Sequence, residues 1–237
     1  MTMNFPLLLL LFALNASDDV PAPSVHPNVK HKGRRIEAAL VLPARVNIVQ
    51  QGIRGANSMP DLEEDIARRL SVLVSAYLAS KGVKILPAAS GDDESEAVRH
   101  EQAEMQRRYD VLDAQIVRKP NGVSKGRFAL GDSVAAYGSA AAGDSIVFIR
   151  GRATVLDKAQ KVIGSVPGPW MWGAKDQTFE GRIVVVDSRS GDVLLFVPFT
   201  TYGHGWKLEV DELLPRIQDS MRRMQPSLAD VLGVKGK

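Results

Sequence analysis

The tripeptide Gly-Asp-Ser occurs twice in the sequence, at 131–133 and at 143–145. A serine hydroxyl becomes a nucleophile when a neighbouring base, most often a histidine, accepts its proton. Ser133 and Ser145 are therefore the side chains whose surroundings first suggest chemistry. The enzyme they would serve is a serine hydrolase or esterase of the Gly-Asp-Ser type.

The sequence offers no suitable base for either serine. Such hydrolases supply the base from an Asp-x-x-His element downstream of the nucleophile, whereas no histidine here has an aspartate three positions before it. Three of the four histidines precede both serines: His26, His31 and His100. The repeat instead suits the two ends of a helix over 132–142, with Asp132 or Ser133 as its cap and Gly143 at its end. We predict no catalytic residue and no enzyme activity.

Composition excludes several further classes of function. The 237 residues are 45% hydrophobic and 24% charged, carry a net charge of +3 and include no cysteine. Without cysteine there are no disulfides and no thiolate metal sites, and the isolated His204 lacks the companion ligands that a metal site needs. Lysine and arginine are scattered among aspartate and glutamate, so we expect no nucleic-acid partner. No phosphate-binding loop is found, and we expect no cofactor.

Three bulky residues form the candidate partner-binding site. The stretch "GSVPGPWMWG" at 164–173 contains Trp170, Met171 and Trp172 between glycines and prolines. Clustered aromatic side chains outside regular structure either cover the core or form a recognition surface. Should they cover the core, the acidic run Asp92–Glu96 is the next candidate interface.

The N-terminus predicts export. The stretch "NFPLLLLLFALNAS" is an apolar run of about a dozen residues, too short to cross roughly 30 Å of hydrocarbon at 1.5 Å per residue. It predicts a signal peptide over 1–16, followed by a flexible, proline-spaced linker over 17–35. Leu14-Asn15-Ala16-Ser17 matches a bacterial lipobox except that Ser17 replaces the lipidated cysteine. We therefore predict a periplasmic or cell-envelope protein without a lipid anchor, either secreted or tethered by an uncleaved N-terminal segment, which is the only part that could contact a membrane.

The remaining patterns predict one α/β domain over 36–225, followed by a tail over 226–237. Strand patterns cover 35–48, interrupted by Pro43, and 145–156. A core helix begins near Pro60, with Ser58 available as its cap, and closes at Gly82. A weaker helical pattern, as one long helix or two short ones, follows Asp92–Glu96.

The clearest local signal is "RIVVVDSRSGDVLLFVPF" at 182–199. Two apolar, β-branched runs flank Ser-Arg-Ser-Gly, which predicts a hairpin with Gly191 at positive φ. Because both runs are apolar at successive positions, both faces of this hairpin should be covered. A closing helix is predicted over 210–224. The fold class is therefore an α/β (α+β) sandwich, with a mixed sheet, a C-terminal antiparallel hairpin and about four flanking helices.

Two of these stretches carry a family resemblance. The strand "GDSIVFIRG" at 143–151 and the hairpin "VVVDSRSGDVLLF" at 184–196 resemble small bacterial envelope proteins of the CsgG and LpoB type. The resemblance implies an α/β sandwich in the cell envelope that acts through protein contacts without catalysis. This chain departs from the pattern in lacking the lipobox cysteine and the usual aromatic residue after the turn.

These observations predict a non-enzymatic, periplasm-facing adaptor that binds another cell-envelope protein or a second copy of itself. One alternative is a hydrolase built around Ser133 or Ser145. Another is a structural subunit of an outer-membrane secretion or surface-assembly complex. For that role only 161–179 could supply membrane strands, and this stretch is short for two strands of about ten residues each.

Overall fold

The computed structural model of the chain describes residues 23–32, 36–52, 55–86, 96–131, 134, 143–156, 177–203 and 215. Several expectations fall outside these residues: the signal peptide at 1–16, the cluster at 170–172, the closing helix apart from Pro215, and the tail. The helix expected over 132–142 is described at Val134, which is helical and buried.

The described part of the chain combines strands and helices in mixed order. The strands are β1 (Ser24–Val25), β2 (Ala38–Val41), β3 (Arg45–Gly52), β4 (Gly55–Ser58), β5 (Lys84–Leu86), β6 (Ser145–Leu156), β7 (Gln177–Asp187) and β8 (Val193–Gly203). The helices are α1 (Pro27–Lys32), α2 (Pro60–Ser80), α3 (Glu96–Arg118) and the 3₁₀ turn η1 (Pro120–Lys125). The acidic stretch thus leads into one long helix, α3, rather than two short ones.

All eight described strands belong to one mixed sheet, which confirms the predicted fold class. The order is β1-β8-β7-β6-β2-β5, with β3 also beside β6 and β4 beside β3. Strands β2 and β3 both run parallel to β6 and pair with successive parts of it. Strand β7 is antiparallel to β6, and β8 is antiparallel to β7. The break between β2 and β3 contains Pro43, which cannot donate to a ladder hydrogen bond.

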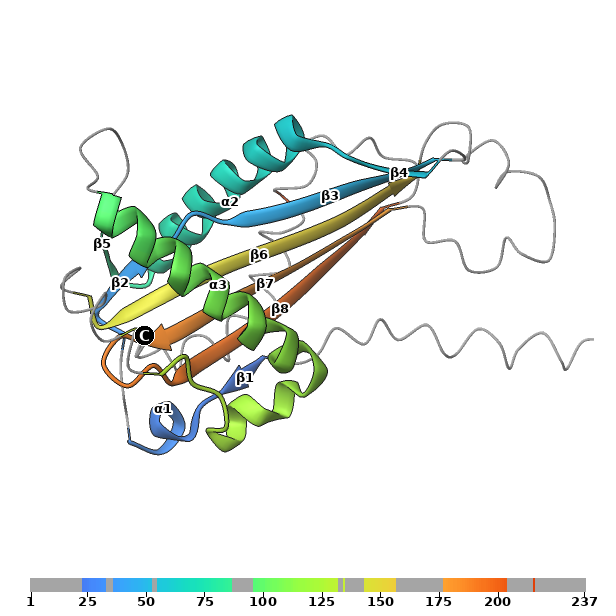
Figure 1. Cartoon of the computed structure of the whole chain (residues 1–237). Helices are drawn as coiled ribbons and strands as arrows, with labels where there is room; N and C mark the ends of the chain where they lie inside the picture. Colours follow the sequence, from blue (N-terminus) through green and yellow to red (C-terminus); the bar gives the residue numbers. More distant parts are fainter. Residues whose placement is uncertain are drawn as a thin grey trace, which may run out of the picture.

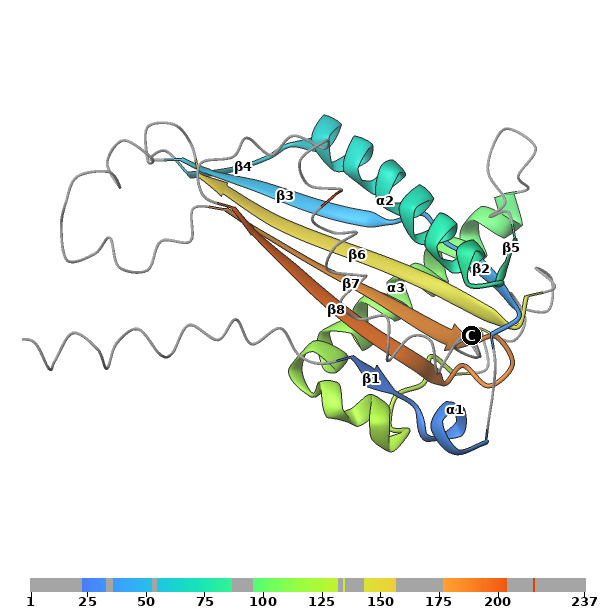
Figure 2. The same cartoon turned by 180° about the vertical axis from the view of Figure 1, so that it is seen from behind.

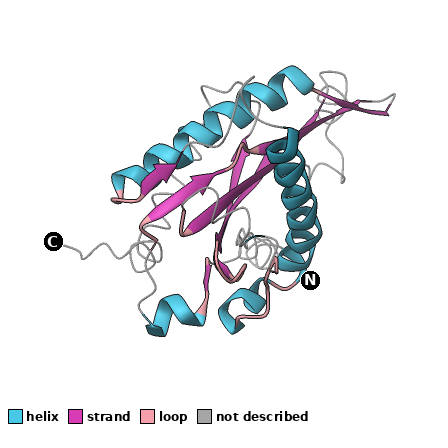
Figure 3. Cartoon of the chain, turned by 60° about the vertical axis from the view of Figure 1, so that its left-hand side comes forward, coloured by secondary structure: helices cyan, strands magenta, loops and turns pink. Residues whose placement is uncertain are grey.

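The long helices α2 and α3 cover opposite faces of the sheet (Figure 3). The predicted apolar stripe of α2 is buried on one face: Ile66, Leu70, Val74 and Leu78. Residues of α3 fill a second core on the other face: Met105, Tyr109, Leu112 and Ile116. The predicted cap of α2 is wrong, because the Ser58 hydroxyl donates to Glu63 Oε1 at 2.9 Å and no side chain caps the helix.

The stretch expected as a linker over 17–35 contains regular structure where it is described. Ser24 and Val25 form β1 and pair with Phe196 and Leu195 of β8. His26 then donates its backbone N–H to Leu194 O at 2.9 Å and accepts from Asn28 N through Nδ1 at 3.1 Å, just before α1 begins. This segment pairs with the outer side of β8, where the backbone groups of β8 would otherwise lack a partner.

The predicted hairpin is the structural centre of the sheet. Strands β7 and β8 pair over most of their length, and Gly191 in the turn has φ of +73°, as predicted. Residues 183–186 and 193–197 are all buried, with side chains in the cores on both faces. The expectation that both faces are covered is therefore confirmed.

One end of the sheet extends beyond the helices. Figures 1 and 2 show β3, β6, β7 and β8 converging past the ends of α2 and α3, with β4 at the far end. We call this end the sheet tip and define it by residues 50–52, 55–57, 154–156, 177–178 and 202–203. Pairing continues there as far as Val155 with Gln177 and Gln177 with Gly203.

Candidate functional site

Both copies of Gly-Asp-Ser meet at the turn between β7 and β8. In the first copy, Gly131 lies against Gly191, and the preceding Leu130 N donates to Gly191 O at 2.9 Å. In the second copy, Ser188 of the turn donates from Oγ to Gly143 O at 2.6 Å and from its backbone N to Asp144 O at 3.0 Å. The repeat therefore brings two chain segments onto one turn.

Ser145 has a structural role. Its side chain is 1% exposed, and its Oγ donates to Asp144 Oδ1 at 3.0 Å. Asp144 Oδ2 in turn accepts from Glu37 N at 2.8 Å, which connects this corner to the start of β2. A hydroxyl enclosed in this way cannot reach a substrate. The other candidate nucleophile, Ser133, lies outside the described residues.

Ser145→Ala should leave the protein folded and chemically unchanged. It removes one hydrogen bond to a carboxylate that keeps its contact with Glu37, so the free energy of unfolding should fall by about 1 kcal/mol. Denaturant unfolding measures this loss, with Ser124→Ala as the control that should lose less, because its single hydrogen bond to Asn121 O is exposed to solvent. Labelling of wild-type Ser145 by a fluorophosphonate would contradict the structural role and restore the hydrolase hypothesis.

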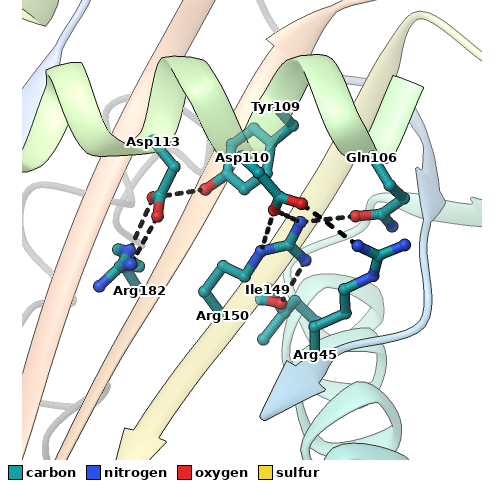
Figure 4. A network of polar contacts seen from close by, with 8 residues as sticks. All are labelled: Arg45, Gln106, Tyr109, Asp110, Asp113, Ile149, Arg150 and Arg182. Carbon is teal, nitrogen blue, oxygen red and sulfur yellow. Dashed lines mark hydrogen bonds and ion pairs between the residues drawn. The ribbon is translucent and has the colours of Figure 1, made fainter. Parts of the chain in front are cut away.

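Charged side chains hold α3 against the sheet (Figure 4). Arg182 of β7 donates from Nε and Nη2 to the two carboxylate oxygens of Asp113 at 2.6 and 2.5 Å. The Tyr109 hydroxyl donates to Asp113 Oδ1 at 3.2 Å. The Asp113 side chain is only 8% exposed, so this pair lies under the helix.

A second arginine forms the neighbouring half of this network. Arg150 of β6, whose side chain is 8% exposed, donates to Asp110 Oδ1 from Nε at 3.1 Å and to Gln106 Oε1 from Nη2 at 2.7 Å. Its guanidinium lies 4.8 Å from the centre of the Tyr109 ring, in cation–π geometry. The exposed Arg45 reaches the other oxygen of Asp110 at 3.3 Å.

The electrostatics of this network suit a structural role. Burial raises the pKa of Tyr109 well above its usual value, and the negative charge of Asp113 adds to the shift. Burial opposes the charged form of Arg182, but the hydrogen bonds and charge of Asp113 leave its pKa raised. Tyr109 therefore stays protonated and Arg182 charged at neutral pH. Within the described residues, no group of three or more His, Cys, Asp or Glu side chains is placed to hold a metal ion.

Sequence reasoning missed this network, although a signal for it exists. Gln106, Tyr109, Asp110 and Asp113 recur at i, i+3, i+4 and i+7, which places polar groups on one side of α3. That pattern normally indicates a solvated face. Only the sheet, with Arg150 and Arg182 on neighbouring strands, turns this face inward.

The candidate site that remains is the sheet tip, because the segment with the predicted binding residues leaves the sheet there. Trp170, Met171 and Trp172 lie outside the described residues, but the chain leaves β6 at Leu156 and enters β7 at Gln177. The described side chains at and beside the tip are mostly small or polar and partly exposed: Ala56, Asn57, Ser58, Thr154 and Thr178. These five side chains are accessible to solvent and belong to neither core.

Comparison with known proteins gives remote likenesses only. No family model and no curated protein matches the chain. Several solved structures match it remotely. Lipoprotein GNA1162 of Neisseria meningitidis has 13% identity and a TM-score of 0.35, over 81% of this chain and 98% of that one. The hypothetical protein CT253 of Chlamydia trachomatis has 10% identity and a TM-score of 0.39, over 84% and 99%.

The third structure is the C-terminal domain of LpoB from Salmonella enterica, with 7% identity and a TM-score of 0.26, over 76% of this chain and 96% of that one. LpoB is one of the two protein types that the sequence resembles. Likenesses at this level decide neither the family nor the partner of the chain. None of the described helices has the length and apolar composition needed to cross a bilayer.

Proposed function

We propose that this protein is a non-enzymatic adaptor of the bacterial cell envelope. It is exported through residues 1–16, faces the periplasm without a lipid at Ser17, and binds another envelope protein. The binding surface is the segment 157–176 at the sheet tip, with Trp170, Met171 and Trp172 as its anchors.

The observation that carries this proposal is the position of the strand ends. Strands β6 and β7 pair in register up to Val155 and Gln177, so the chain leaves and re-enters the sheet at the tip on either side of residues 157–176. The tip extends beyond α2 and α3 (Figure 1), which keeps a partner at this end clear of both helices. Tryptophan is the residue most often found as an energetic anchor of protein interfaces.

The remaining chemistry of the described residues is consistent with binding rather than catalysis. Ser145 is buried and bonded to Asp144, and the ionised side chains under α3 are bonded to one another. Of these groups, Ser145, Asp113 and Arg150 are buried and closed to a substrate. The hydrolase alternative thus loses one of its two nucleophiles.

The double substitution Trp170→Ala with Trp172→Ala should abolish partner binding while the melting temperature stays nearly unchanged. Loss of two anchor side chains costs at least about 2 kcal/mol each at an interface, whereas tryptophans that serve an interface and not the core contribute little to the stability of the fold. The measurement is photo-crosslinking in living cells from a benzoylphenylalanine at position 171, which should yield one defined adduct that the double variant lacks.

The matched control places the same photoreactive residue at Val72, an apolar position of α2 that is 65% exposed. It should give no defined adduct. A double variant that melts many degrees lower would show that the tryptophans belong to the core. The interface would then have to be sought at the start of α3. An adduct of twice the chain's mass would identify the partner as a second copy.

A further inference from the structure

A cationic cavity lies where α3 ends and η1 begins. Its volume is about 740 Å³, within the range of ligand sites, and its walls include both charged and apolar side chains. The charged ones are Arg118, Lys119, Lys125 and Arg127, and the apolar ones include Pro120 and Phe128. We call this the η1 cavity.

The four cations of the η1 cavity lie in a stretch of the sequence without acidic residues. Residues 114–131 contain these four cations and no aspartate or glutamate. Within the described part of the chain, none of the four has an ion-pair partner.

Nearby cations of α3 behave differently from those of the cavity. Arg107 and Arg108 bind Glu104 at 2.8 and 2.9 Å, and their hydrogen bonds lower the pKa of Glu104 to about 2. Arg45, Arg150 and Arg182 bind Asp110 and Asp113. These five arginines are thus paired, whereas the four cations of the η1 cavity have no ion-pair partner among the described residues.

The end of α3 does not cancel this charge. A helix C-terminus carries roughly −0.5 of an elementary charge, and Lys119 N already bonds the carbonyls of Gln115 and Ile116 there. Against four formal positive charges this is a small correction. The cavity therefore favours an anion.

The N-terminal segment enters the domain beside this cavity. Gly126 closes η1 with φ of +63°, and a Cβ built there would lie 2.8 Å from His26 Nε2. His26 follows β1 directly, and β1 lies next to η1 at the lower edge of the fold (Figure 1). The chain that leads from the apolar run into the fold therefore arrives at the cationic surface.

We propose that the η1 cavity binds the phosphate of an anionic phospholipid headgroup. The proposal rests on the envelope location proposed above. Six residues, 17–22, separate the apolar run from the first described residue and span at most about 20 Å when extended. With the N-terminal run kept as an uncleaved membrane tether, the domain holds the cavity close to the headgroups. The exposed Val117 and the half-buried Phe128 supply apolar contacts beside the charges.

The test compares vesicles of phosphatidylcholine with vesicles that also contain phosphatidylglycerol, using the full chain. The apolar N-terminal run contributes equally to both, so the ratio of the two affinities reports the cavity. At about 1 kcal/mol for each cation near an anionic surface, Lys125→Gln with Arg127→Gln should reduce this ratio roughly 30-fold. High salt should reduce it similarly in the wild type.

The matched control neutralises two other exposed cations, Lys84→Gln with Arg189→Gln, and should keep the ratio within about twofold because both lie outside the cavity. Equal ratios in the two variants would overturn the proposal. A second arm titrates soluble glycerol phosphate: if only this ligand distinguishes the cavity variant, the source is a soluble phosphate and not a lipid. Crosslinking from position 171 in the cavity variant, Lys125→Gln with Arg127→Gln, reports the adaptor function separately. The adduct should be the same as in the wild type.

Discussion

Gly191→Val should lower the free energy of unfolding by about 3 kcal/mol, which corresponds to a melting temperature roughly 10 °C lower for a chain of this size. Two causes add. Gly191 has φ of +73°, and a β-branched residue held there costs about 1–3 kcal/mol. A Cβ would also lie 2.8 Å from both N and O of Gly131, and backbone atoms cannot move aside as a flexible side chain does.

Gly82→Val separates these two causes. Gly82 has a similar φ of +84°, but a Cβ there meets no atom within 4 Å. This variant should therefore show only the backbone strain, about half of the loss expected at position 191. Thermal unfolding of both variants measures the difference. Equal losses would show that the contact between the β7–β8 turn and the first Gly-Asp-Ser copy contributes nothing to stability.

The parts of the fold that sequence reasoning predicted are those with local causes. The strand predicted over 145–156 is β6 with the same bounds, because an unbroken β-branched run follows a turn at Gly143-Asp144. The β7–β8 hairpin and its positive-φ glycine follow from two similar runs around a short polar loop. Helix α2 follows from Pro60, the acidic first turn and an apolar stripe of period 3.6.

The parts that it could not predict depend on contacts between distant segments. No local pattern in residues 38–52 predicts that β2 and β3 lie one after the other along β6. That arrangement depends on the pairing of both strands with the long strand β6. Pairing of Ser24 and Val25 with β8 likewise depends on an edge that exists only once the sheet has formed. A proline-rich stretch before a domain is typical of a linker, and the linker expectation followed from that.

The same distinction applies to the site. The absence of a downstream Asp-x-x-His argues against a catalytic role for Ser145, and the structure places this side chain in a buried corner. That both Gly-Asp-Ser copies meet at one turn could not be predicted, since it requires the positions of Gly131, Gly143 and Gly191 together. The candidate residues at 170–172 stay a prediction.

Arg182→Met should cost about 3 kcal/mol, the second large effect. The substitution keeps an apolar chain in place but removes both hydrogen bonds to Asp113, a carboxylate that is 8% exposed and retains only the Tyr109 hydroxyl as a donor. Loss of one partner from a buried pair leaves the other charge uncompensated, and this typically costs about 3–5 kcal/mol. Denaturant unfolding at neutral pH measures the loss.

A second substitution shows whether the cost comes from the stranded charge. In Arg182→Met with Asp113→Asn, the amide oxygen still accepts from Tyr109 and no buried charge remains, so the double variant should lose only about 1–2 kcal/mol, less than Arg182→Met alone. Arg45→Met is the control for an exposed pair: Arg45 and Asp110 are 51% and 47% exposed, and water replaces the lost contact for less than about 1 kcal/mol. The single variant Asp113→Asn completes the comparison. If the loss of the double variant equals the sum of the losses of Arg182→Met and Asp113→Asn, Arg182 stabilises the contact of α3 with the sheet through its packing and not through its charge.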